Sequence, residues 1–406
     1  MGVKRLVPLE DGRRLIAELR GKYYFNRGTE GMKIAEVLNR ELADNLVSKG
    51  RSPPHDFASY DGYAMCAVDC KSYPLKIVHK IYAGDGYESL PRLRKGEAMT
   101  IATGAFLPKG ADTVLRLEDA KVEDDLLYGI SIARGTKVVK AGSNYEKGNV
   151  MLRKGQKLRP QEIGLLHDLG VVKVRVYKKP RVAVFSTGDE VYNGLLRDTN
   201  APMIMAFLQE WGCEAEYLGT VPDNLEKTKE IFLKASEFDA AITSGGVSVG
   251  EKDYVLRAME ELGELLLHKV KTRPGKPIAI GIIKDKPVFG LPGKPTGTFI
   301  AAELNLKRYF LGNALRPNIR ARIGEAIKLS VKDTDAADIA NIVFVHRYNG
   351  TAYPVGFPDS HMRLINPGEL YNVSTIASSL MATIADGYVI VEKDLEKGEV
   401  VKVNLF

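Results

Sequence analysis

The sequence predicts a multidomain protein of α/β plus β architecture. Its 406 residues are more than one hydrophobic core usually organises, and 45% hydrophobic with 27% charged side chains are typical of a folded chain. Strand-like and helical runs alternate after Pro180, whereas short strand-like runs separated by glycine and proline dominate residues 51–150. We therefore expect two to four domains, one of which is built on a parallel sheet.

Two helical patterns flank the β-rich segment. The residues from Met32 to Gly50 place apolar side chains at helical spacing and end on glycine, which predicts an amphipathic helix. A second helical pattern covers Arg159 to Leu169. We interpret residues 51–150 as a β module inserted between two parts of one helical element.

The second half of the chain alternates strands and helices, which indicates a parallel sheet with right-handed crossovers. Asn200 is a candidate cap of the first helix in this half. After Pro317 we expect no further helices, and the alternation about the turn at Glu396–Gly398 predicts a small β barrel or sandwich. The predicted strands are 181–185, 214–218, 240–243, 277–282 and 287–291, and the predicted helices are 202–212, 225–236 and 254–262.

Candidate substrate-binding residues follow these strands, because ligands of open α/β sheets bind at the carboxyl ends of the strands. They are Ser186, Thr187, Gly188 and Asp189 after the first strand, Ser244, Gly245, Gly246, Val247, Ser248 and Gly250 after the third, and Pro292, Gly293 and Lys294 after the last. The glycines of the middle loop would let backbone N–H groups approach a phosphate, although a simple tight turn is the alternative. The loop has neither the Walker nor the dinucleotide spacing, which disfavours NTP hydrolysis of the P-loop type.

Three acids, Glu190, Asp223 and Asp253, follow three different strand ends. Mg²⁺ uses one or two protein carboxylates together with substrate phosphates, so these residues are candidate metal ligands. Helix capping is the alternative for each of them.

The net charge of the whole chain is weak evidence for anionic partners, whereas a local cluster of cations is stronger evidence. The chain has 58 Lys and Arg against 51 Asp and Glu, a net +7, and the segment 269–276 contains four cations and no acid. Its Pro-Gly-Lys-Pro turn predicts a preorganised anion site, and a solvated basic loop is the alternative. Without a basic helix or an aromatic RNA-binding pattern, nucleic-acid binding is not expected.

The cysteine and hydropathy patterns exclude further classes. Three cysteines without a second pair indicate neither a disulfide framework nor a zinc site. The sequence has no run of about eighteen apolar residues and no apolar signal-peptide core, so we expect a cytoplasmic protein without membrane segments. The segment 52–64 combines two acids, a histidine and aromatic residues, which is typical of a functional loop.

Seven segments resemble, in order and spacing, the molybdopterin molybdenumtransferase or MoeA family, whose relatives include the E domain of gephyrin. They are SPPHDFASYDGYA (52–64), IATGAFLPKGADTV (101–114), FSTGDE (185–190), DTN (198–200), SGGVSVGEKDY (244–254), RPGKP (273–277) and GLPGKP (290–295). The resemblance covers nearly the whole chain.

The resemblance implies four parts: a helical dimerisation region (1–50 plus 151–178), an inserted β-rich module (51–150), a three-layer α/β domain of molybdopterin-binding type (179–318) and a C-terminal β barrel (319–406). It implies the final step of molybdenum cofactor synthesis, in which adenylylated molybdopterin is cleaved with release of AMP and molybdate enters the dithiolene. It also implies Mg²⁺ as cofactor, a homodimer with the cleft between two subunits, and contacts with the upstream adenylyltransferase and with acceptor molybdoenzymes.

Site residues are carried over by motif. Asp61 and Thr103, from the partner subunit, would act in catalysis with Glu190 and Asp253. The metal and the phosphates would be held by Glu190, Asp223 and Asp253. The oxyanion site would be formed by Arg273, Lys276, Pro277 and Arg347.

The sequence departs from the family at several positions. Tyr60 stands where Met is usual, Arg273 where Lys is usual and Asn144 where an acid is usual, and Lys294 adds a cation to the last turn. Molybdate and tungstate are too alike for the sequence to separate. Two alternatives stay open: a molybdopterin adenylyltransferase, against which the β module and barrel argue, and a non-catalytic molybdopterin-binding scaffold, against which the acids argue.

Overall fold

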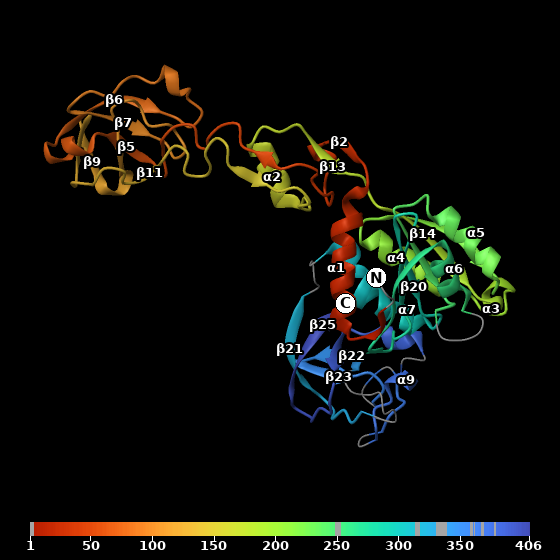
Figure 1. The fold of residues 1–406 in the computed structure, drawn as a ribbon. Coiled ribbons are helices and arrows are strands. Elements are labelled where there is room, and N and C mark those ends of the chain that lie inside the picture. The colour runs from red at the N-terminus through yellow and green to blue at the C-terminus, as the bar shows by residue number, and fades with distance from the viewer. Residues whose placement is uncertain are drawn as a thin grey trace. The chain divides into compact units, whose positions relative to one another are not determined.

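The computed structural model describes residues 4–247, 253–312, 317–329, 339–357, 360, 362–366, 369–376 and 379–406. The chain forms two compact units, one of Met1–Gly28 with Tyr177–Phe406 and the other of Thr29–Val176 (Figure 1). Each of the five hydrophobic clusters among the described residues lies within one unit. Each unit therefore has a core of its own.

The first unit contains a seven-stranded sheet in the order β1-β17-β19-β20-β16-β14-β15. Its strands are β1 (Lys4–Val7), β14 (Arg181–Thr187), β15 (Glu214–Val221), β16 (Ala240–Ser244), β17 (Gly263–Val270), β19 (Ala279–Ile283) and β20 (Lys286–Leu291). Its helices are α1 (Leu9–Tyr23), η1 (Tyr24–Asn26), α3 (Asp189–Tyr192), α4 (Asn200–Glu210), α5 (Leu225–Ala235), α6 (Tyr254–Leu262), α7 (Pro295–Ala301), the π-helical η6 (Ala302–Leu306) and α8 (Lys307–Leu311).

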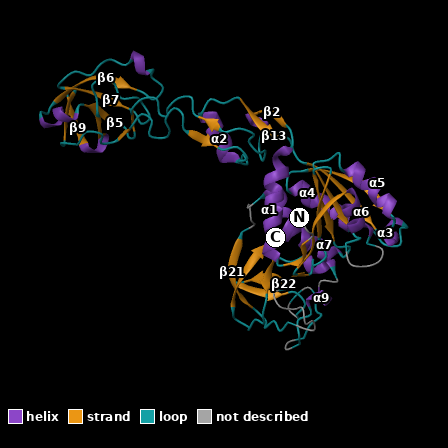
Figure 2. Cartoon of the chain, viewed as in Figure 1, coloured by secondary structure: helices purple, strands orange, loops and turns teal. Residues whose placement is uncertain are grey.

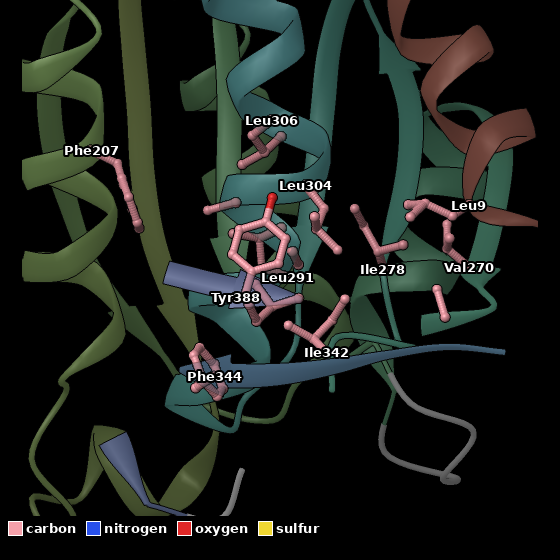
Figure 3. Packing of buried hydrophobic residues seen from close by; sticks show 14 of the residues in the cluster. Leu9, Phe207, Val270, Ile278, Leu291, Leu304, Leu306, Ile342, Phe344 and Tyr388 are labelled. Atoms are coloured by element: carbon pink, nitrogen blue, oxygen red, sulfur yellow. The ribbon is translucent and has the colours of Figure 1, made fainter. Parts of the chain in front are cut away.

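The two faces of this sheet bury different side chains. Along β14, Val182 and Val184 belong to one cluster and Ala183 and Phe185 to another, as the alternation of a strand requires. The first cluster includes residues of α1, α4, η6 and α8, and the second includes residues of α5 and α6. Figure 3 shows part of the first cluster, with Leu291 and Ile278 close to the helical residues Leu304 and Leu306. The expected three-layer α/β domain is confirmed.

The expectation of an all-parallel sheet is wrong for part of it. Strands β15, β14, β16 and β20 are parallel neighbours, but β19 runs antiparallel to both β20 and β17. Lys284 and Asp285 have φ of 47° and 60°, so a two-residue turn joins β19 to β20 as a hairpin. Strand β17 and the long helix α1 are not among the elements predicted from the sequence.

The C-terminal residues form the expected barrel. The strands β22 (Ala340–Tyr348), β23 (Thr351–Pro354), β21 (Asn318–Ile323), β25 (Val400–Leu405) and β24 (Gly387–Val391) pair in this order, and β24 closes the ring on β22. A short strand, β18 (Thr272–Arg273), pairs in parallel with β22. The expectation that helices stop after Pro317 is wrong, because α9 (Val373–Ile376) and η7 (Leu380–Thr383) follow.

The second unit contains a six-stranded sheet in the order β8-β5-β7-β6-β10-β9, together with three small strand pairs and one α-helix (Figure 2). The sheet consists of β5 (Gly62–Met65), β6 (Leu75–Ile81), β7 (Glu97–Ile101), β8 (Thr113–Arg116), β9 (Ala120–Glu123) and β10 (Leu126–Gly129). The pairs are β2 (Thr29–Lys33) with β13 (Lys173–Tyr177), β3 (Leu46–Val47) with β12 (Val150–Leu152) and β4 (Phe57–Ala58) with β11 (Val138–Val139). The helical segments are α2 (Pro160–Asp168), η2 (Ile34–Glu36), η3 (Ala67–Lys71), η4 (Tyr87–Ser89) and η5 (Leu117–Asp119).

The helix expected over Met32–Gly50 is wrong, whereas α2 confirms the second helical pattern. In residues 32–50 only the single turn η2 is helical. Backbone groups of this segment bond to a distant one instead: Asn39 N–H donates to the Leu158 carbonyl at 2.7 Å and Leu42 N–H to that of Gln156 at 2.9 Å. The part of the first predicted domain formed by 29–50 and 151–176 is therefore built mainly by strand pairing.

No helix in the described part of the chain is long and apolar enough to cross a membrane.

Candidate active site

A cavity of about 810 Å³ in the first unit lies at the carboxyl ends of β14, β16 and β20. This is the edge where a ligand site was expected. Most of the predicted site residues of the first unit line it: Ser186, Thr187, Gly188, Glu190, Asp223, Ser244, Gly245, Gly246, Val247, Asp253, Arg273, Lys276, Pro277, Pro292, Gly293 and Lys294. Ser248 and Gly250 lie outside the described residues, and Asp189 is adjacent to the lining residues but not among them.

The loop after β16 needs glycine for close backbone packing. Gly245 has φ of +93°, and a Cβ at this position would lie 2.5 Å from the carbonyl oxygen of Thr187. Its N–H donates to the Leu291 carbonyl at 3.1 Å, so this group joins two strand ends. The backbone N–H of Gly245, which was predicted to bind a phosphate, is therefore used for a contact between the loop and the end of β20.

Asn200 connects two loops of the cavity, a role that the sequence analysis missed. It is 7% exposed, and its Nδ2 donates to Ser244 Oγ at 2.7 Å and to the Gly293 carbonyl at 2.8 Å. The expectation that Asn200 caps α4 is wrong, because Asp198 Oδ1 accepts the N–H groups of Asn200 and Ala201, both at 3.0 Å. Asp198 also accepts from Ser186 Oγ at 2.6 Å and lines the cavity. The D-T-N motif before a helix was the available signal for both residues.

The acids line the cavity from separate segments of the chain: Glu190 lies in α3, Asp223 follows β15 and Asp253 precedes α6. Asp223 N–H donates to Asp189 Oδ1 at 3.0 Å, so Asp189 anchors the loop that carries Asp223. Among the residues that the structure describes, no three His, Cys, Asp or Glu side chains are close enough together to hold a metal ion. Glu190, Asp223 and Asp253 therefore fit only an ion that takes one or two protein carboxylates and completes its shell with substrate oxygens, as Mg²⁺ does.

Cations approach the cavity from a rigid turn. Arg273 lies in β18, and Pro274, Gly275, Lys276 and Pro277 continue the lining. Gly275 has φ of +96°, and a Cβ there would lie 3.3 Å from Ile300. The two other cations of the basic segment, Lys269 and Lys271, are not lining residues. Of the four cations in the segment 269–276, Arg273 and Lys276 therefore remain candidates for the anion site.

Arg347 does not belong to this cavity. It lies exposed on β22, where Asn341 is the residue paired with Arg273. With a rise of about 3.3 Å per residue, the strand carries Arg347 roughly 20 Å from that pairing. The structure therefore does not bring Arg347 to the other predicted oxyanion residues of the first unit.

Asp61 and Thr103 meet in the second unit. Asp61 Oδ1 accepts the backbone N–H of Thr103 at 2.6 Å and its Oγ1 at 2.9 Å. These bonds favour the carboxylate, and they lower the pKa of Asp61 below its ordinary value. Both side chains are exposed, so the pair presents an ionised carboxylate to solvent at neutral pH.

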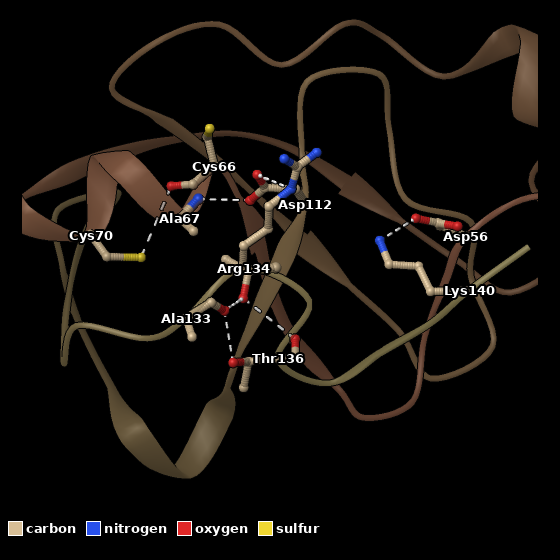
Figure 4. Close-up of polar contacts among 10 residues, drawn as sticks. Asp56, Cys66, Ala67, Cys70, Asp112, Ala133, Arg134, Thr136 and Lys140 are labelled. Atoms are coloured by element: carbon tan, nitrogen blue, oxygen red, sulfur yellow. Dashed lines mark hydrogen bonds and ion pairs between the residues drawn. The ribbon is translucent and has the colours of Figure 1, made fainter.

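The functional-loop candidate 52–64 is held by polar and aromatic contacts. Figure 4 shows Lys140 paired with Asp56, at 2.7 Å. Burial by itself raises the pKa of Asp56, but Lys140 and the N–H of Ala141 outweigh it and the pKa is lowered. The His55 ring stacks on Tyr87 with centroids 3.7 Å apart and meets the edge of Phe106. His55 therefore has a structural role in an aromatic cluster.

Known families match both halves of this arrangement. The family described as "MoeA N-terminal region (domain I and II)" matches residues 7–170, and the family described as "Probable molybdopterin binding domain" matches residues 183–311. The chain is 30% identical over 426 aligned residues to a protein of Methanocaldococcus jannaschii named for molybdopterin biosynthesis, with 99% of each chain covered.

Two curated relatives have an enzyme name. The molybdopterin molybdenumtransferase of Haemophilus influenzae is 32% identical, with 68% of this chain and 70% of that one covered. The molybdopterin molybdenumtransferase of Bacillus subtilis is 33% identical, with 69% of each chain covered.

Solved structures agree over the full length. Two crystal structures of MoeA proteins from Pyrococcus horikoshii match with TM-scores of 0.77 and 0.73, at 25% and 31% identity, and each covers at least 98% of both chains.

The fold and the cavity thus define a protein of molybdenum cofactor biosynthesis in which a β-rich N-terminal unit accompanies a molybdopterin-binding-type α/β domain and a barrel. The chain belongs to the MoeA family, whose curated members above are transferases.

Proposed function

We propose that this chain is a molybdopterin molybdenumtransferase that acts in the cytoplasm. It would cleave adenylylated molybdopterin in a Mg²⁺-dependent reaction, release AMP and insert molybdate, or the similar tungstate, into the dithiolene. The observation that carries this proposal is the mixed charge of one cavity, with Glu190, Asp223 and Asp253 beside Arg273, Lys276 and Lys294. Both signs in one cavity suit a phosphate that binds together with a divalent cation, next to an oxyanion.

Each residue group would have a separate task. One or two of the carboxylates of Glu190, Asp223 and Asp253 would hold Mg²⁺, which when bound neutralises charge on the pyrophosphate as its P–O bond breaks. A carboxylate of this set would accept a proton from the water that adds to phosphorus, giving AMP and molybdopterin, which keeps the other phosphate of the pyrophosphate. Arg273 and Lys276 would hold the molybdate dianion by charge-assisted hydrogen bonds. Two thiol protons and one oxide would then leave as water, without change of oxidation state.

AMP release tests the proposal directly. Purified protein, adenylylated molybdopterin, Mg²⁺ and molybdate should give AMP in a chromatographic assay, and omission of the oxyanion should lower the rate. Asp253→Asn should lower turnover by about 100-fold or more, since it removes a charge from the reacting centre. Glu261→Gln is the matched control, because Glu261 lies at the other end of α6 in an exposed pair with Lys229.

Three results would count against the proposal. AMP release that is independent of any oxyanion would argue against insertion, and consumption of ATP with free molybdopterin would favour the adenylyltransferase. Binding of molybdopterin without turnover would favour a scaffold. Parallel assays with molybdate and tungstate would show which metal is preferred.

We propose further that the protein works as a homodimer in which Asp61 and Thr103 of the partner subunit complete each site. The support is the ionised, exposed Asp61–Thr103 pair, whose side chains belong to none of the hydrophobic clusters of the second unit. A mixture of Asp61→Ala and Asp253→Ala subunits should regain about one quarter of wild-type activity, because mixed dimers have one intact site. Sites completed within a single subunit would give no recovery.

A further inference from the structure

A second cavity, of about 380 Å³, lies elsewhere in the first unit. It is lined by α1, α8 and the barrel strands β24 and β25, and it shares no lining residue with the candidate active site. Its volume is within the range of small-molecule sites. Nothing in the proposed reaction uses it.

The charged side chains of this second cavity are unevenly paired. Lys307 Nζ lies 2.5 Å from Glu303 Oε1 and both are buried, so these two charges compensate one another. Glu399 accepts the N–H of Glu396 in the turn before β25. The remaining cations of the lining are Arg13, Arg308 and Lys402, and among the described residues only Arg13 of these three has an acid partner, the exposed Glu10.

Arg308 differs from the other cations that line the second cavity. It is partly buried, and its guanidinium makes no hydrogen bond or ion pair with any residue in the described part of the chain. Burial and the neighbouring Arg13 both lower its pKa, while Glu10 and Tyr388 act weakly in the other direction. Two guanidinium groups facing one cavity repel each other, and a doubly charged anion between them would remove that cost.

Part of the lining of the second cavity is apolar. Leu304, Val389 and Leu405 line it with the ring of Tyr388, which is 6% exposed. Figure 3 shows Tyr388 of β24 beside the helical segment that carries Leu304. A ligand with only a charged group would leave this part of the lining without a contact, whereas an organic anion would cover it.

We infer that the second cavity binds a small organic phosphate monoester. The phosphate would pair with Arg308 and Arg13, since the guanidinium fork matches phosphate oxygens and a dianion balances two cations. Lys402 would lie at the solvent end, because its side chain is exposed, and the organic group would pack on Leu304 and Leu405.

Phenyl phosphate is the probe, and calorimetric titration of the full-length protein is the measurement. Arg308→Met should weaken binding by about 10-fold or more, because a charge-assisted hydrogen bond is lost while the aliphatic volume is kept. Lys402→Met should weaken it as well, and this exposed position keeps the test valid if Arg308→Met fails to fold. Arg320→Met is the matched control, an exposed arginine of β21 outside the lining.

Hydrogen exchange distinguishes the two cavities. Phenyl phosphate should slow exchange in β24 and α8, and inorganic phosphate should bind more weakly because it leaves the apolar part of the lining uncovered. Unchanged affinity in both Arg308→Met and Lys402→Met would overturn the inference. So would protection confined to the strand ends at 186–190 and 291–294, or equal affinity for the two phosphates.

Discussion

A single neighbour holds the carboxylate of Asp61 in its ionised form. Thr103 supplies both bonds to Asp61 Oδ1, with the backbone N–H as the larger contribution to the lowered pKa and the hydroxyl as the second. Because the pKa is lower in the folded chain, these bonds stabilise the fold above the unfolded pKa of about 3.9. That stabilisation is lost as the pH falls through the lower folded value.

Replacement of the hydroxyl should therefore raise the pKa of Asp61 without restoring its ordinary value. In Thr103→Val the backbone donor stays and the side-chain donor is lost. A carboxyl-carbon NMR titration measures the change, and Asp119, whose pKa Arg116 lowers, should titrate as before. An Asp61 titration that is the same in both proteins would contradict the assigned bonds.

Asn200 gives a second prediction for a single residue. Asn200→Ala removes the donor to Ser244 Oγ and to the Gly293 carbonyl, and leaves the buried Ser244 Oγ without this partner. We expect the free energy of unfolding to fall by about 1–3 kcal/mol. Urea denaturation followed by circular dichroism checks this, and an unchanged midpoint would show that water replaces the amide.

Whether an element can be predicted from the sequence depends on where its backbone groups find their hydrogen-bond partners. Helix α5 is predicted correctly, because its capping residue Asn224 and its apolar face lie within the same dozen residues. The segment 32–50 has helical spacing too, but Ile34, Val37 and Leu42 pack against Leu158 and Leu166 from more than a hundred positions away. The helical spacing of these apolar residues indicates correctly that their side chains are buried. The backbone conformation of the segment 32–50 is set instead by its pairing with residues that are distant in sequence.

Gly245, in the loop after β16, can be compared with Gly212, which follows α4 and has a similar positive φ. Gly245 and Gly212 have φ of +93° and +81°, but a Cβ meets the Thr187 carbonyl oxygen at the first and nothing within 4 Å at the second. Gly212→Ala should cost about 1–2 kcal/mol, the penalty of the left-handed region.

Gly245→Ala should cost more, because strand ends must move apart as well. The difference in unfolding free energy from urea titration isolates the steric contribution. Equal losses in the two variants would show that the loop relaxes freely, and that close packing is not the reason for glycine at this position.

The whole molecule is organised by separate cores. Three hydrophobic clusters lie entirely within residues 29–176, and the two others lie within the remaining residues. One cluster joins the α/β domain to the barrel, with Ile204 and Ile342 among its members, so these two regions share a core. Four acids and three cations line the candidate active site, so this site does not account for the net charge of +7.

A fragment of residues 29–176 should therefore fold without the rest of the chain. We expect a cooperative urea transition with a midpoint close to that of the same unit in the intact protein, because no cluster is cut at its ends. Tryptophan fluorescence of the intact protein reports the other unit, since its one tryptophan is Trp211. A fragment without a cooperative transition would show that residues 4–28 or 177–406 stabilise it.

The sequence by itself determined the strand and helix alternation of residues 181–262, the carboxyl-end position of the site and most of its lining residues. These features depend on short motifs and local periodicity, which are readable in a single chain. Only the tertiary structure decided the hairpin that reverses β19, the pairing of residues 32–50 with 150–176, the separation of Arg347 from the cavity and the meeting of Arg13 with Arg308. Each of these depends on a contact between distant positions, and local periodicity contains no information about such a partner.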